Sequence, residues 1–353
     1  MAKELWKGNE AIAEAAIRAG CKYFFGYPIT PQNEIPEYLS LHLPKIGGCF
    51  IQAESEVAAI NMVYGAAGCG VRVMTSSSSP GISLKQEGIT YMCGAELPAV
   101  IVNMMRGGPG LGTIQPAQGD YFQATRGGGN GDYRHLVLAP ATIQEAADFV
   151  QLAFDLAEQY RNPVMVVADG MIGQMMEAIE WRTPEKRELP EKTWATTGTK
   201  GERKPNIINS LYIDPNLCAV HNERLAAKYQ AMADNETRWE EVDTEGCEVL
   251  FVSYGTPSRI CRAAIRQLEK EGIKAGLFRP ITLWPFPGEA LKRVASQESV
   301  KAVVDVELSM GQMIDDVKIA LEGCRPVSFI GKAGGVVPTP AEVAAAAKAA
   351  IGR

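Results

Sequence analysis

The stretch that decides the fold is VRVMTSSSSPGISLKQEGITYMCGAELPAVIVN, residues 71–103. It opens with a short apolar run at 71–75, continues with apolar residues at helical spacing over 83–92, and closes with a second apolar run at 99–103. Apolar runs of this length fit buried strands, and a helix between two such strands is the crossover unit of a parallel sheet. We therefore predict a parallel α/β fold.

The same alternation extends outward through the first half of the chain. The spacing of apolar residues predicts further helices at 9–19, 54–68 and 143–160, and further strands at 23–27 and 164–168. Strands that alternate with helices of this length indicate a doubly wound parallel sheet with helices on both faces.

Changes in composition divide the chain into three parts. Residues 1–180 are predicted to form the first domain, and residues 181–245 a connecting arm with prolines, many charges and one long polar helix at 222–245. The alternation then resumes and ends in an alanine-rich helix at 339–351. Residues 246–353 are predicted to form a second, smaller α/β domain.

The charge balance excludes some classes of partner. The 353 residues carry 35 Lys and Arg against 41 Asp and Glu, a net charge of -6, so we expect neither nucleic acid nor an anionic membrane as partner. Apolar runs such as 98–102 fall far short of the roughly 18 residues of a membrane helix. The first residues carry no export signal, which predicts a cytoplasmic protein.

The cysteines are too scattered for a metal centre. The chain has eight cysteines and three histidines, without a C-x-x-C pair. Zinc sites and iron-sulfur clusters need ligands at short intervals. We therefore expect no metal to be held by this chain alone.

Two motifs follow predicted strands and place polar groups where parallel sheets bind ligands. In Tyr27-Pro-Ile-Thr-Pro31, two prolines hold Thr30, which either donates a hydrogen bond to a ligand or caps the next helix. In residues 75–81, TSSSSPG, the hydroxyls either hold an anion or cap a helix.

Glu54-Ser-Glu56 introduces a helix whose other residues are small or apolar, and that helix is expected to be buried. Carboxylates in a first turn commonly just complement the helix dipole. A carboxylate that enters a buried helix is instead expected to have a partner or a function.

A glycine-rich segment begins at Arg106 with RGGPGLGT, followed by Gln118-Gly-Asp120 and RGGGNGD at 126–132. It does not open a helix, so it is not a dinucleotide fingerprint. Long ordered loops are commonly functional, and Arg106 either grips a carboxylate or forms a surface salt bridge. A stiff apolar segment at 279–287, RPITLWPFP, is expected to pack between domains or between subunits.

In this order and spacing, the motifs resemble the 2-oxoacid:ferredoxin oxidoreductase family over nearly the whole chain. The resemblance is to the subunit with a thiamine diphosphate pyrimidine-binding domain and a domain similar to the transketolase C-terminal domain. It is greatest for the branched-chain 2-oxoacid (3-methyl-2-oxobutanoate) type.

The resemblance implies roles for three residues. Glu56 takes the place of the family's catalytic, cofactor-binding glutamate, which contacts the aminopyrimidine, while Thr30 and Arg106 take the places of substrate-binding residues. Glu54 is the adjacent alternative to Glu56. A carboxylate on the pyrimidine nitrogen favours the imino tautomer, which accepts the proton from the thiazolium carbon.

The resemblance also implies partner subunits. Thiamine enzymes hold Mg²⁺ and diphosphate with a G-D-G motif, which this chain lacks; Ala168-Asp-Gly170 is the nearest match. We expect Mg²⁺ in a diphosphate-binding thiamine subunit and iron-sulfur clusters in a ferredoxin-like subunit. The family's complexes can also contain a further small subunit. The serine turn, residues 75–81, departs from the family's Thr-Ser-Gly-Pro-Gly because it has Ser-Ser-Ser-Pro-Gly at 77–81.

The implied activity is oxidative decarboxylation of a branched-chain 2-oxoacid with coenzyme A and ferredoxin, yielding acyl-CoA, CO₂ and reduced ferredoxin. Two alternatives stay open: the same subunit of a pyruvate or 2-oxoglutarate enzyme, and a non-catalytic thiamine-domain scaffold. Retention of Glu56, Thr30 and Arg106 together favours an enzyme.

Overall fold

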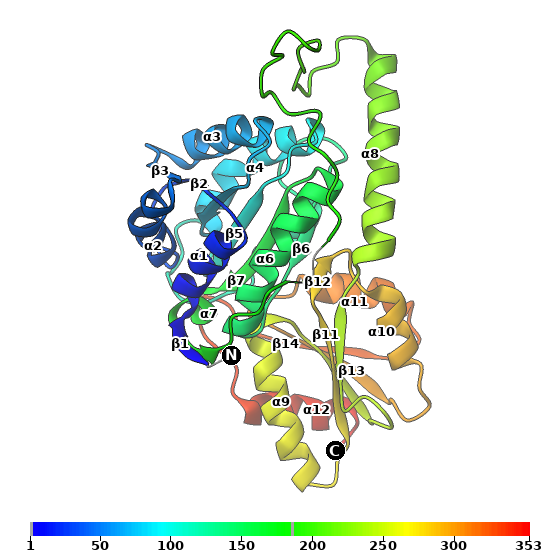
Figure 1. Ribbon diagram of the computed structural model, residues 1–353. Coiled ribbons are helices and arrows are strands. Elements are labelled where there is room, and N and C mark those ends of the chain that lie inside the picture. The colour runs from blue at the N-terminus through cyan, green and yellow to red at the C-terminus, as the bar shows by residue number, and fades with distance from the viewer. Residues whose placement is uncertain (1–2, 185–186) are drawn as a thin grey trace.

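A parallel sheet forms the first domain of this computed structural model, which describes residues 3–184 and 187–353 (Figure 1). In the described part of the chain, its neighbouring strands are β12 (Thr282–Trp284), β6 (Leu136–Leu138), β7 (Val164–Asp169), β5 (Val100–Met105), β4 (Val73–Ser77), β2 (Tyr23–Gly26) and β3 (Cys49–Gln52). All neighbours pair in parallel except β12, which runs antiparallel to β6. The predicted parallel α/β fold is confirmed.

Helices cover both faces of this sheet because alternate strand residues point to opposite sides. Along β5, Ile101 and Met105 pack toward one hydrophobic cluster, while Val100, Val102 and Met104 pack toward another. The first cluster includes side chains of α3 (Glu56–Gly68) and α4 (Ser79–Gly94). The second includes side chains of α1 (Gly8–Arg18), α2 (Glu34–His42), α6 (Ile143–Tyr160) and α7 (Gly170–Gln174), with the short helix η1 (Pro44–Ile46) following α2.

The second domain has its own mainly parallel sheet. The order of its strands is β14 (Val327–Gly331), β13 (Ala302–Glu307), β10 (Val249–Val252), β11 (Ala275–Pro280) and β9 (Trp239–Val242). One face packs on α9 (Gly255–Lys270) and α12 (Pro340–Ala350). The other face, with α10 (Gly288–Ala295) and α11 (Met313–Leu321), shares a continuous hydrophobic cluster with the α3 and α4 side of the first domain.

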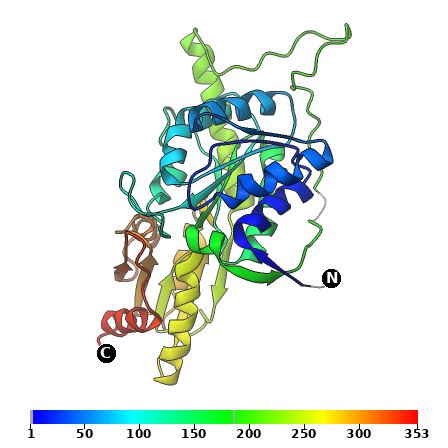
Figure 2. The ribbon, with the colours of Figure 1, turned by 90° about the vertical axis from the view of Figure 1, so that its left-hand side faces the viewer.

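The arm differs from the prediction at both ends of its helix. The polar helix was expected at 222–245, but α8 spans Pro215–Glu236, and β9 then pairs antiparallel with β11. Asp214 caps the helix by accepting a hydrogen bond from the Asn216 amide, and Pro215 suits the first helical position. Figures 1 and 2 show α8 beside the first domain, with the extended segment before it projecting past that domain.

The apolar segment at 279–287 lies between the two domains. β11 ends within it at Pro280 and β12 lies wholly within it, so the chain crosses here from the second sheet to the first. Arg279 is 2% exposed, and its guanidinium donates to both oxygens of Glu145, at 2.6 and 3.0 Å, and to Glu240 at 2.6 Å. Of the two roles expected for this segment, the structure shows packing between domains.

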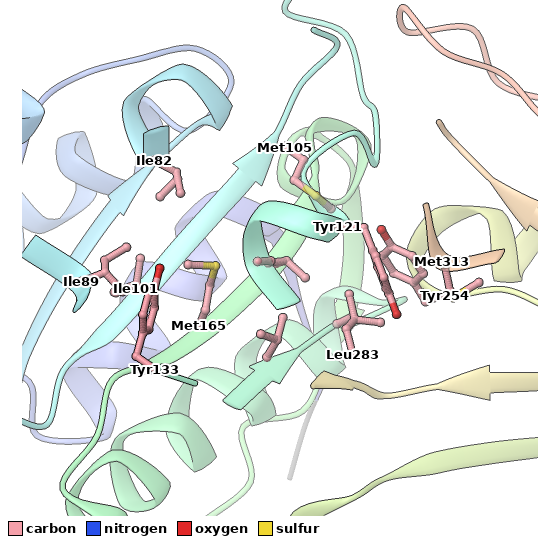
Figure 3. Packing of buried hydrophobic residues seen from close by; sticks show 14 of the residues in the cluster. Ile82, Ile89, Ile101, Met105, Tyr121, Tyr133, Met165, Tyr254, Leu283 and Met313 are labelled. Carbon is pink, nitrogen blue, oxygen red and sulfur yellow. The ribbon is translucent and has the colours of Figure 1, made fainter. Parts of the chain in front are cut away.

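Aromatic rings add to the contact between domains. The rings of Tyr121 and Tyr254 lie 5.9 Å apart between their centroids, with Leu283 and Met313 close by (Figure 3). Tyr121 belongs to α5 (Tyr121–Arg126), a short helix inside the segment that was expected to be irregular. The two domains therefore share one core, which fixes the loops of one against the loops of the other.

The remaining strands form a small ribbon near the N-terminus, where β1 (Glu4–Lys7) pairs antiparallel with β8 (Met176–Ile179). Among the residues described, no helix combines the length and apolarity needed to cross a bilayer. The division at 180 and 245 stays a prediction, and β9 shows that the second sheet recruits a strand from the predicted arm.

Candidate active site

The candidate residues gather at the carboxyl edge of the first sheet. Thr30 follows β2, the serine turn (residues 75–81) covers the end of β4 and the start of α4, and Arg106 follows β5. Glu56 begins α3, which packs on α4 just beyond that turn. Open parallel sheets bind ligands at this edge, so the topology alone brings separate motifs together.

Glu56 and Glu54 lie in different environments. Glu56 is the first residue of α3 and is 7% exposed, whereas Glu54 is exposed and precedes the helix. Ser55 caps α3 by accepting a hydrogen bond from the Ala58 amide at 3.1 Å. The capping role is therefore filled by Ser55, and the Glu56 carboxylate has no hydrogen-bond or ion-pair partner among the described residues.

The helix that follows Glu56 is only half buried, which corrects the expectation of a fully buried helix. The face with Ala59, Ile60 and Val63 is buried, while Val57 and Asn61 are exposed. Its residues are small and apolar nearly all round, so periodicity could not distinguish the two faces. Glu56 belongs to the buried face.

The serine turn forms the wall beside Glu56. A Cβ added to Gly81 would overlap with the Ser77 hydroxyl and lie 2.8 Å from Glu56 Oε1, so glycine is needed for this close approach. The hydroxyls of Ser77 and Ser78 are buried without a hydrogen-bond partner. Buried polar groups without partners are uncommon and mark places where a ligand can supply the missing bond.

Arg106 contacts the backbone of Thr30. Arg106 Nη1 donates to the Thr30 carbonyl at 3.0 Å, and Nη2 donates to the Leu111 carbonyl at 3.2 Å. Arg106 is 8% exposed and its Nε is buried without a partner. The Thr30 hydroxyl accepts from Asn33 Nδ2 at 3.3 Å, which leaves its own proton free to donate.

A polar network that the sequence did not reveal connects these parts. The Ser79 hydroxyl donates to Asp120 Oδ2 at 2.5 Å, and Asn103 Nδ2 donates to the same oxygen at 2.9 Å. The Arg106 amide donates to Ser79 Oγ at 3.0 Å. Burial raises the pKa of Asp120, and the hydrogen bonds from Ser79 and Asn103 oppose that rise.

Ser79 thus has a role that its place in the sequence hinted at only weakly. The sequence drew attention to Asp120 through Gln118-Gly-Asp120 and to Ser79 through the serine turn, but not to their contact. The signal that could have predicted the contact between Ser79 and Asp120 is the presence of two short polar motifs, at 75–81 and 118–120. This contact holds the serine turn against the loop that carries Arg106.

Two cavities open beside these residues. One of about 440 Å³ is lined by Thr30, Pro31, Ile114 and Met171 among others, together with Val337 of the second domain. Another of about 370 Å³ lies between the serine turn, the 107–110 loop and residues 308–312. Both have walls from both domains, so the shared core between the domains also shapes the cavities.

Asp169, the aspartate of the nearest match to G-D-G, is engaged inside the fold. It ends β7 and caps α7, accepting from the Met171 amide at 2.9 Å. Burial raises its pKa, so its charged form is disfavoured, unlike that of a Mg²⁺ ligand. In the part of the chain that the structure describes, no group of three or more His, Cys, Asp or Glu is arranged to hold a metal ion.

The architecture is the α/β fold that transketolase also has. The structure of a transketolase encoded by a split gene matches 98% of this chain and 98% of its own, with a TM-score of 0.61 and 18% identity, which shows the shared fold. A structure titled 2-oxoglutarate:ferredoxin oxidoreductase from Magnetococcus marinus with 2-oxoglutarate, coenzyme A and succinyl-CoA bound matches 99% of this chain with a TM-score of 0.88 and 26% identity. This chain spans 65% of that one.

Residues 14–241 match the family described as pyruvate flavodoxin/ferredoxin oxidoreductase, thiamine diphosphate-binding, and residues 247–343 match pyruvate:ferredoxin oxidoreductase core domain II. The chain belongs to this family, the 2-oxoacid:ferredoxin oxidoreductases, and the resemblance identified from the motifs is confirmed. It is 48% identical to the ketoisovalerate oxidoreductase subunit VorB of Methanothermobacter marburgensis, over 95% of this chain and 94% of that protein. It is 37% identical to the 2-oxoglutarate synthase subunit KorA of Methanocaldococcus jannaschii, over 97% and 98%.

Proposed function

We propose that this chain is the subunit of a branched-chain 2-oxoacid:ferredoxin oxidoreductase that binds the pyrimidine end of thiamine diphosphate. The enzyme would convert 3-methyl-2-oxobutanoate and coenzyme A to the acyl-CoA and CO₂ while reducing ferredoxin. The observation that carries the proposal is Glu56: a buried carboxylate at the head of a helix and beside unpartnered serine hydroxyls, which forms no hydrogen bond or salt bridge with any described residue.

The donors and acceptors at this place fit an aminopyrimidine. Glu56 would accept a hydrogen bond from a ring nitrogen, and Ser77 and Ser78 have hydroxyls free to bond to its polar edge. Thiamine diphosphate, when bound, supplies the carbanion that attacks the oxoacid. The Glu56 carboxylate would favour the imino tautomer of the pyrimidine. A glutamine could not do this because its amide carries no charge.

Thr30 and Arg106 would bind the oxoacid. The Thr30 hydroxyl can donate a hydrogen bond, and the Arg106 Nε–H has no protein partner. Two other guanidinium hydrogens already bond to the Thr30 and Leu111 carbonyls, which fixes the plane of the group. A fixed guanidinium binds a carboxylate in a defined orientation at low entropic cost.

We further propose that partner subunits complete the site. This chain lacks G-D-G, and Asp169 is engaged in a helix cap, so the Mg²⁺ and diphosphate would bind to another subunit and the iron-sulfur clusters to a ferredoxin-like subunit. Large apolar side chains that are mostly exposed gather on the arm, at Ile207, Leu211, Ile213, Leu217 and Val220. Clustered exposed apolar groups are typical of subunit contacts. The eight cysteines are all free, which suits a cytoplasmic protein.

The choice of oxoacid is tested by reconstitution with the partner subunits. We expect kcat/KM for 3-methyl-2-oxobutanoate to exceed those for pyruvate and 2-oxoglutarate, measured as oxoacid-dependent reduction of ferredoxin or a dye. A preference for either of the other two oxoacids would move this chain to the corresponding enzyme. Absence of turnover with all three, in a complex that contains cofactor and clusters, would favour the scaffold alternative.

A further inference from the structure

Lys85 is a fully buried lysine, 0% exposed, on the helix that packs against the helix of Glu56. It lies in the middle of α4, and its ammonium donates one hydrogen bond, to Thr75 Oγ1 at 3.1 Å. A buried ammonium is costly unless a charge compensates it, and one hydroxyl is a weak compensation. Such a group is expected to have an electrostatic partner.

The packing of α4 on α3 identifies that partner. Gly81, Lys85 and Gly88 are spaced four and three residues apart and so share one face of α4. Gly81 meets Glu56, and Gly88 meets Ile60, where an added Cβ would lie 2.6 Å from the isoleucine side chain. Lys85 is therefore held between these two close approaches, on the side of α4 that faces Glu56.

The described elements packed around Lys85 offer no other charged side chain as its electrostatic partner. Burial lowers the pKa of Lys85 to about 8, and the negative charge of Glu56 partly opposes that fall. β4 and β5 carry no acidic or basic side chain between Val73–Ser77 and Val100–Met105. On α4 itself, Glu87 is exposed and bonds to Tyr91.

We propose that Lys85 is a positioning residue that acts through Glu56, because its buried positive charge attracts the Glu56 carboxylate and holds it at the pyrimidine-binding end of the site. This inference rests on the proposed function of Glu56. Coulomb attraction between the ammonium and the carboxylate acts across a poorly hydrated gap, where it is little screened. Lys85 would thereby keep Glu56 placed to bond to the ring nitrogen of a bound pyrimidine.

The first test is the pH profile of the reconstituted enzyme. Lys85→Met removes the charge but keeps a long apolar side chain, and it should move the acidic limb of kcat/KM for the oxoacid up by about one pH unit. Lys85→Arg keeps a charge and should return that limb toward its original position. Lys228→Met, which removes another largely buried lysine paired with Glu96, is the control and should leave the limb in place.

The second test does not depend on activity. In the purified full chain, Lys85→Met should raise the midpoint of thermal unfolding by about 2–4 °C more when Glu56 is already replaced by Gln than when Glu56 is present. Additive midpoints together with an unmoved acidic limb would overturn the proposal for Lys85. Normal turnover of Glu56→Gln would instead overturn the proposed function of Glu56, whatever the unfolding measurements show.

Discussion

Replacing Gly81 with alanine tests the close packing that confines Glu56. The substitution adds a single methyl group to the first part of α4, at a backbone conformation that alanine can adopt. That methyl group would overlap with the Ser77 hydroxyl and press on the Glu56 side chain. Ser77 is 0% exposed and has no room to turn aside freely, so we expect Glu56 to be displaced.

Two opposing free energies set the expected magnitude. Overpacking a tight site costs about 1–3 kcal/mol, whereas alanine improves helix propensity over glycine by about 1 kcal/mol. The net loss of stability should therefore be roughly 0–2 kcal/mol, too small to unfold a domain of this size. Turnover should fall by more than tenfold, because a shift of about 1 Å in a catalytic group can cost about a hundredfold in rate.

Gly65→Ala is the matched control, because Gly65 lies on α3, is exposed, and has open space where a Cβ would stand. This variant should gain about 0.5–1 kcal/mol of stability and keep its activity. The assays are thermal unfolding of the purified chain and oxoacid-dependent dye reduction of the reconstituted complex. Wild-type turnover in Gly81→Ala would refute the view that this packing positions Glu56.

Four further variants follow from the site and the fold. Glu56→Gln should abolish turnover in an intact complex, and full activity of Glu56→Gln beside an inactive Glu54→Gln would reassign the role. Arg106→Ala should raise KM for the oxoacid far more than KM for coenzyme A, with partial rescue by Lys; equal effects on both would indicate a structural role. Arg279→Met should cost about 2–3 kcal/mol in denaturant unfolding, below the roughly 3–5 of a fully buried pair because its carboxylate partners are partly hydrated. Thr339→Ala should cost about 1 kcal/mol in the same measurement, through loss of the α12 capping box, and an unchanged midpoint would contradict that.

Most of the fold was predictable because its long elements are strongly periodic. The helix at Ile143–Tyr160 begins and ends where apolar spacing placed it, and the strand predicted at 164–168 is β7, Val164–Asp169. Seven strands of three to five residues were missed, since such short runs carry too little periodicity; they are β1, β3, β6, β8, β9, β12 and β14. β9 was read as the end of α8 because its polar residues suit a solvated helix, and its pairing with β11 is a long-range contact that local sequence does not reveal.

The site was predictable in part. Thr30 follows β2 and Arg106 follows β5, so the carboxyl-edge rule could have predicted the contact between Arg106 and the Thr30 carbonyl. Sequence could not show that Arg106 bonds to backbone carbonyls, because the course of the loop decides it. Lys85 was missed because a lysine in a helix is normally solvated, and only its spacing from Gly81 and Gly88 hinted at burial.

The central claim, that this chain holds half of a thiamine site, is tested most directly by thiamine diphosphate binding to the purified chain with and without its partner subunits. The diphosphate and its Mg²⁺ supply much of the charge available for binding, and this chain offers them no G-D-G motif. We expect the lone chain to contain no iron, to bind the cofactor only weakly and to turn over no oxoacid, and the partner subunits to restore both binding and turnover. Micromolar affinity for thiamine diphosphate, or oxoacid-dependent dye reduction by the chain alone, would contradict the account.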